Sequence, residues 1–106
     1  MYLRNLIASI NDSSRHLCIV AKQPWAGSAE AKLVELTSAF GVPSKDLEEG
    51  YEYFLEVSVA FEEVINGPGV ALTDEQRFEA VLYYAQNDAF PEWLCQLRSD
   101  NEAERQ

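Results

Sequence analysis

The chain has 106 residues, 47% of them hydrophobic, which is enough apolar material for one folded domain with a packed core. Its 18 acidic residues outnumber its 8 Lys and Arg residues, and the net charge of −10 disfavours direct binding to nucleic acid or to an anionic membrane. No apolar run approaches the roughly 18 residues of a membrane span, and the N-terminus does not resemble a signal peptide. We therefore expect a cytoplasmic protein with a single domain over residues 1–106, of which 98–106 form a frayed tail.

The acidic residues are concentrated in the segment between Lys45 and Arg77, which contains no basic residue. Nine carboxylates fall there: Asp46, Glu48, Glu49, Glu52, Glu56, Glu62, Glu63, Asp74 and Glu75. Without a counter-charge in the segment, they predict a negative field over one region of the surface. Two interpretations stay open, since the charge can serve only to keep a small protein soluble or can attract a basic protein partner.

The first part of the chain predicts a short helix and then a strand. Over residues 2–10 the apolar residues recur at the spacing of one helix face, and the polar cluster at 11–14 ends the pattern. These apolar residues are Leu3, Leu6, Ile7 and Ile10. Residues 17–21 form a short, partly β-branched apolar run that ends before Pro24, which is typical of a strand.

Residues 29–40 fit either a helix or a strand, and periodicity alone does not decide between them. A helix would end at Gly41 and would place four apolar residues on one face, namely Ala29, Leu33, Leu36 and Phe40. A strand would occupy residues 32–37, which alternate imperfectly. The following residues predict a loop at 41–45 and a polar, acidic stretch at 46–50.

Residues 51–57 alternate with the period of a half-buried strand. One face would carry Tyr51, Tyr53, Leu55 and Val57, and the other would carry Glu52, Phe54 and Glu56. Ser58 can then cap a helix over 59–65, which the Asn-Gly-Pro-Gly sequence at 66–69 stops. A single helix over 51–65 is the competing interpretation, and we favour a strand followed by a helix.

The C-terminal part contains the best-specified helix, which starts after Thr73. Thr73 and Gln76 have the spacing of a capping box, and an apolar stripe follows before turn-forming residues at 87–88 end the helix. The stripe consists of Phe78, Val81, Leu82 and Ala85. Pro91 can open a final short helix that returns Trp93, Leu94 and Leu97 to the core.

Residues for catalysis or metal binding are sparse. The sequence has no GxSxG, P-loop, dinucleotide-binding or HExxH motif, and a single histidine, His16, makes a catalytic triad hard to build. Cys18 is predicted to be a buried thiol, and Cys18, Cys95 and His16 are too few and too scattered for a zinc site. The adjacent glutamates at 48–49 and 62–63 diverge by about 100° on a helix and predict a solvated face. We expect no enzymatic activity and no cofactor or metal.

The motif YY-x-x-NDAF closes the predicted main helix, where it reads Tyr83-Tyr84-Ala85-Gln86-Asn87-Asp88-Ala89-Phe90. It is preceded by Phe54-Leu55-Glu56-Val57-Ser58 and Phe61-Glu62-Glu63-Val64-Ile65. Over residues 25–90 the chain resembles a family of small bacterial proteins with an aromatic-rich strand, a short helix and a final helix. Some of these look like immunity proteins of contact-dependent or polymorphic toxin systems. The resemblance favours a strand at 31–37 and implies a protein that neutralises a toxin domain.

These elements predict an α+β fold. A small antiparallel sheet of about three strands is expected to pack against the C-terminal helices and the short N-terminal helix. No linker, internal repeat or second domain interrupts this pattern.

The function that we predict is that of a cytoplasmic immunity protein that binds a basic toxin domain, such as a nuclease, through an acidic surface. Opposite electrostatic fields would speed association with such a partner. The candidate partner-binding residues are Glu48, Glu49, Glu52, Glu56, Glu62, Glu63 and Tyr83. The alternative is a small acidic structural or regulatory adaptor without a toxin partner.

Overall fold

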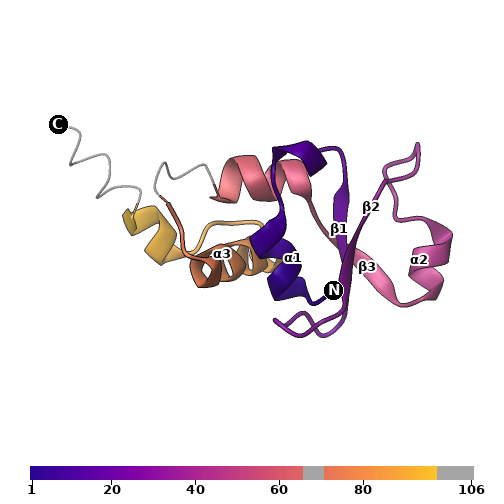
Figure 1. The fold of residues 1–106 in the computed structure, drawn as a ribbon, viewed down its shortest axis with the longest axis horizontal. Helices are drawn as coiled ribbons and strands as arrows, with labels where there is room; N and C mark the ends of the chain where they lie inside the picture. The colour runs from indigo at the N-terminus through magenta and orange to yellow at the C-terminus, as the bar shows by residue number, and fades with distance from the viewer. Residues whose placement is uncertain (66–70, 98–106) are drawn as a thin grey trace.

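A three-stranded antiparallel sheet stands between two groups of helices in the computed structural model, which describes residues 1–65 and 71–97 (Figure 1). Residues 92–97 form a helical segment near the end of the described chain. This architecture confirms the predicted α+β class. The other elements, in chain order, are α1 (Leu3–Ser9), the 3-10 turn η1 (Asp12–Ser14), β1 (Cys18–Lys22), β2 (Ala31–Val34), α2 (Ser44–Glu48), β3 (Tyr51–Glu56), the π-helical segment η2 (Val59–Ile65) and α3 (Asp74–Asn87).

Strand β1 lies at the centre of the sheet, in the order β2-β1-β3, and both of its faces are covered. Ile19 and Ala21 belong to the main core, which α1, η2 and α3 complete on one side of the sheet. Val20 pairs with Lys32, whose ammonium reaches Asp46 of α2 on the other side (Figure 1). This two-sided burial explains why β1 is a continuous apolar run in the sequence.

Helix α3 begins and ends where the sequence predicts. The Thr73 hydroxyl oxygen accepts a hydrogen bond from the Gln76 N–H at 3.1 Å, and the Gln76 side-chain oxygen accepts one from the Thr73 N–H at 2.9 Å. These two bonds form the predicted capping box. At the other end Asp88 adopts the left-handed conformation, with φ 53°, and terminates the helix after Asn87.

The segment at 29–40 contains the strand β2 and then irregular chain, so the preference for a strand is confirmed. β2 is shorter than the predicted 31–37, because its pairing with β1 ends where Val34 meets Cys18. The sequence prediction of loop and polar chain at 41–50 missed helix α2, which begins directly after Pro43.

The region after β3 is helical, as predicted, although η2 is a π-helix with wider turns than an α-helix. Because β3 occupies the first part of 51–65, the competing single helix over that range is wrong. The predicted stop at 66–69 and the predicted frayed tail at 98–106 lie outside the described residues.

A β-bulge in β3 interrupts the predicted alternation, so that side chains before and after it do not lie on the predicted faces. Ile19 pairs with Leu55 but Val20 pairs with Tyr53, so Phe54 is an extra residue in the ladder. An extra residue moves every later side chain to the opposite face of the sheet. The prediction that Tyr53 and Leu55 share a face is therefore wrong, since Leu55 enters the main core and Tyr53 lies on the face of Val20.

Truncating the two adjacent aromatic residues tests the bulge. Phe54 is 2% exposed and its ring centroid lies 4.9 Å from that of Trp25, so Phe54→Ala should lower the free energy of unfolding by about 3–5 kcal/mol. Tyr53 is 44% exposed, and Tyr53→Ala should lower it by about 1 kcal/mol or less. Urea denaturation measures both values. A larger loss for Tyr53→Ala would show that the strand alternates without a bulge.

Candidate protein-binding site

The six glutamates predicted to bind a partner fall into two groups at the two ends of β3. The group at its start consists of Glu48, Glu49 and Glu52, and the group at its end consists of Glu56, Glu62 and Glu63. Strand geometry separates these ends by roughly 17 Å. All six side chains are exposed except that of Glu56, which is half-buried. Tyr83, the seventh predicted residue, is exposed on α3 beside a separate hollow that Pro91 and Trp93 help to line.

Within β3, the two glutamates that belong to these groups point to different faces of the sheet. Glu52 pairs with Ala21, whereas Glu56 pairs with Cys18. Ala21 and Cys18 are three residues apart in β1, so their side chains lie on opposite faces. The acidic segment therefore forms two surfaces and not the one that the charge pattern predicted.

Two lysines from the first third of the chain bring positive charge to the start of β3, where one of them contacts Glu49. Lys32 Nζ lies 2.5 Å from Asp46 Oδ1 and 3.7 Å from Glu49 Oε2. Lys32 and Lys22 also lie over the Tyr51 ring, 4.6 and 5.0 Å from its centroid. The hydrogen bond to Asp46 raises the pKa of Lys32. The expectation of nine uncompensated carboxylates is wrong here, because lysines distant in the sequence lie beside them.

One glutamate of the group at the end of β3 is paired as well. Arg15 forms a salt bridge with Glu62, and the Tyr84 hydroxyl lies 3.5 Å from Glu63 Oε2. Within residues 1–65 and 71–97, neither Glu56 nor Glu35 takes part in a salt bridge. The end of β3 therefore presents two carboxylates without an ion-pair partner among the described residues.

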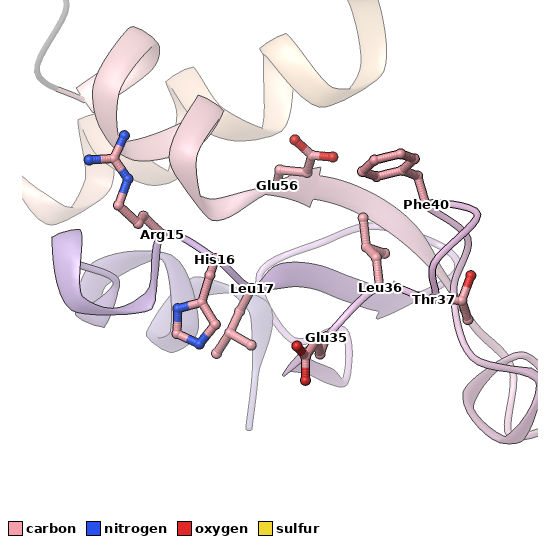
Figure 2. Close-up of a pocket in the computed structure, with 8 residues that line it drawn as sticks. All are labelled: Arg15, His16, Leu17, Glu35, Leu36, Thr37, Phe40 and Glu56. Atoms are coloured by element: carbon pink, nitrogen blue, oxygen red, sulfur yellow. The ribbon is translucent and has the colours of Figure 1, made fainter.

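The antiparallel sheet creates a groove at this end. Because Cys18 pairs with both Val34 and Glu56, the chain entering β1 lies between the chain leaving β2 and the end of β3. The groove there has a volume of about 290 Å³ (Figure 2). It is lined by Arg15, His16, Leu17, Glu35, Leu36, Thr37, Phe40 and Glu56. Figure 2 shows the Phe40 ring and the Glu56 carboxylate directed toward one another, with the Leu36 side chain below the ring.

Phe40 is displayed to solvent by a hydrogen-bonded turn. Its N–H donates to the Thr37 carbonyl at 2.8 Å, and the Thr37 N–H donates to the Gly41 carbonyl at 2.9 Å. The Gly41 N–H donates in turn to the Thr37 hydroxyl at 3.2 Å. Phe40 is 80% exposed and has a φ of 61°, a left-handed conformation that bulky residues seldom adopt. The turn thus fixes the backbone at Phe40, and aromatic side chains are typical anchors for a protein partner.

Sequence reasoning missed Glu35, Leu36 and Phe40 as site residues. The helical interpretation of 29–40 placed Leu36 and Phe40 on a buried face, and the structure exposes Phe40 instead. One local signal was present, since Phe40 stands among turn-forming residues, immediately before Gly41.

Beneath the groove, Cys18 is a protonated thiol, and its burial confirms the sequence prediction. Burial and, to a smaller extent, the charge of Glu56 raise its pKa to about 12. The same two causes raise the pKa of Tyr53 on this face. Since the folded-state pKa of Cys18 exceeds that of the unfolded chain, its contribution to stability is present at neutral pH and is lost as the pH rises above roughly 9.

No protein-family model, curated protein or solved structure matches the chain. The resemblance to immunity proteins therefore stays a prediction from the motif. In the described part of the chain no helix is long and apolar enough to cross a membrane. The same residues contain no group of three or more His, Cys, Asp or Glu side chains placed to hold a metal ion.

The two thiols should differ sharply in reactivity. Cys95 is exposed, whereas the raised pKa of the buried Cys18 lowers its thiolate fraction about 1000-fold at pH 8. Dithionitrobenzoate should therefore modify one thiol in the native protein and two in urea. Cys95→Ser should abolish the native reaction and Cys18→Ser should preserve it. Rapid modification of native Cys95→Ser would contradict the assignment of Cys18 as a buried thiol.

Proposed function

We propose that this chain is a cytoplasmic immunity protein that binds and neutralises a basic toxin domain, such as a nuclease. The observation that supports this best is the surface at the end of β3, where Glu35 and Glu56 form no salt bridge with described residues. The motif resemblance at residues 83–90 supplies the toxin as the partner class.

The charge distribution favours a basic protein as the partner. A net charge of −10 raises the rate of encounter with a positively charged domain, and this effect weakens with salt. A nuclease site is built to hold phosphates, so a carboxylate surface can occupy it or cover a neighbouring region. The proposal therefore requires electrostatic complementarity between the two proteins and no chemical step.

Binding, and not catalysis, is the role that this site supports. A catalytic cysteine is a thiolate near neutral pH in a partly exposed, electropositive setting. Cys18 is completely buried, and its pKa is raised to about 12 beside the acidic Glu56. The groove residue closest in type to a general base, His16, is an exposed side chain at its rim (Figure 2).

The alternative function, a structural or regulatory adaptor, draws on the apolar part of the groove. Leu36 and the exposed Phe40 could anchor a partner without electrostatic attraction. An adaptor of this kind would bind with an affinity that changes little with salt.

The direct test uses the C-terminal domain of the polypeptide encoded immediately upstream of this gene. We expect that domain to be basic, to be toxic when expressed alone and to be harmless when co-expressed with this protein. Titration at low and high salt should show tight binding that weakens as salt increases. A domain that neither binds nor harms the cell would refute the proposed function for that pair and favour the adaptor.

Charge reversal locates the interface. Glu62→Lys/Glu63→Lys should slow association with the toxin domain by about tenfold at low salt and reduce the salt dependence, because both positions lie on the acidic surface at the end of β3. The control, Glu79→Lys/Glu92→Lys, makes the same change in net charge at exposed positions on α3 and on the helical segment 92–97. Stopped-flow fluorescence measures the rates. Equal slowing by both double variants would show that net charge matters and this surface does not.

A further inference from the structure

The groove at the end of β3 combines an aromatic ring, an aliphatic floor and two carboxylates. Phe40 supplies an exposed ring, Leu36 lies below the ring, and Glu35 and Glu56 supply negative charge (Figure 2). Arg15 is the basic residue of the lining, and Glu62 holds its guanidinium. The groove therefore has the contacts that suit a cationic group with an apolar stem.

Elsewhere in the protein, an arginine side chain contacts an aromatic ring and a carboxylate together. The Arg4 guanidinium carbon lies 5.1 Å from the centroid of the Phe78 ring, and Arg4 Nη1 lies 2.9 Å from Glu75 Oε2. The same guanidinium thus contacts an aromatic face and a carboxylate at once. Lys32 does likewise between Tyr51 and Asp46. At the groove, Phe40 and Glu56 offer the ring and the carboxylate to a cation from outside.

The groove has a volume of about 290 Å³, which is enough for one side chain, and its chemistry favours arginine. A planar guanidinium can stack on a ring and can form two hydrogen bonds with a carboxylate, which a lysine ammonium does not match. Its three methylene groups can lie along apolar side chains such as Leu17 and Leu36.

We propose that this groove binds an arginine side chain presented by a protein partner, with the guanidinium between the Phe40 ring and the Glu56 carboxylate. The inference rests on the proposed function for the partner's basic character, and it names one contact of that interface. The turn at 37–41 fixes the backbone at Phe40 before binding, so little ordering of the main chain is required when the arginine enters.

The first test uses a probe in place of the partner. Acetyl-arginine amide is titrated into the ¹⁵N-labelled protein, and amide shifts are followed by NMR. We expect saturable shifts at residues 36–41 and at Glu56, with millimolar affinity. Acetyl-citrulline amide, which has nearly the same shape without the charge, should produce none. Equal shifts with both probes, or shifts confined to other regions, would overturn the inference.

Matched substitutions distinguish binding in this groove from a nonspecific effect of the protein's negative charge. Phe40→Ala and Glu56→Gln should each weaken binding of the arginine probe about threefold, the size expected for one cation–π contact or one exposed ion pair. Leu47→Ala and Glu79→Gln make comparable changes at exposed positions of α2 and α3, outside the groove, and should leave the affinity unchanged. Thermal melts check that all four variants are folded. Equal affinity for the probe across the set would also overturn the inference.

The complete toxin domain then distinguishes this inference from the proposed function. If the domain binds the wild-type protein and binds Phe40→Ala/Glu56→Gln at least tenfold more weakly, both are supported. If it binds the double variant as tightly as the wild-type protein, the arginine site is wrong and the proposed function stands. If it does not bind the wild-type protein, the proposed function fails, and the probe titration alone decides on the groove.

Discussion

The burial of strand β1 on both faces is the constraint on which the rest of the fold depends. Residues 18–21 are completely excluded from solvent, although the sheet has only three strands. Helices α1 and α3, with η2, cover one face, and α2 with the chain around it lies on the other (Figure 1). Edge strands alone cannot bury a central strand in this way, so the helices on both sides are a requirement of the core. The Lys32–Asp46 ion pair belongs to this arrangement, since it joins β2 to α2.

Local signals in the sequence predicted most of the elements, and long-range pairing determined the features of the sheet and the ion pairs that were missed. Two of these signals are the capping box of Thr73 and Gln76 and the apolar run of β1. Each involves only residues close together in the sequence, so the pattern alone was sufficient to predict the element. The bulge at Phe54 depends on how β3 meets β1, and no pattern within residues 51–57 reveals it. The ion pairs of Lys32 and Arg15 with the acidic segment were missed for the same reason, because these cations lie far away in the sequence.

For the candidate site, the sequence indicates the chemistry but not the geometry. An excess of carboxylates was visible, and Glu56 was among the candidates, yet its position on the opposite face from Glu52 follows only from the register of β3. Antiparallel pairing also brings Glu35 to the same end of the sheet, although it lies outside the acidic segment. The two ends of β3 therefore differ electrostatically, since lysines lie over Tyr51 at one end and unbridged carboxylates flank the groove at the other.

Phe40 is the residue that folding alone explains least well. A bulky side chain in the left-handed region costs on the order of 1–3 kcal/mol, and a ring that is 80% exposed recovers little of that by burial. The three hydrogen bonds of the turn at 37–41 hold this conformation without any contribution from the ring. Glycine would satisfy the same turn with less strain. The exposed ring and the Glu56 carboxylate beside it in the groove are therefore the two features on which the proposed arginine contact depends.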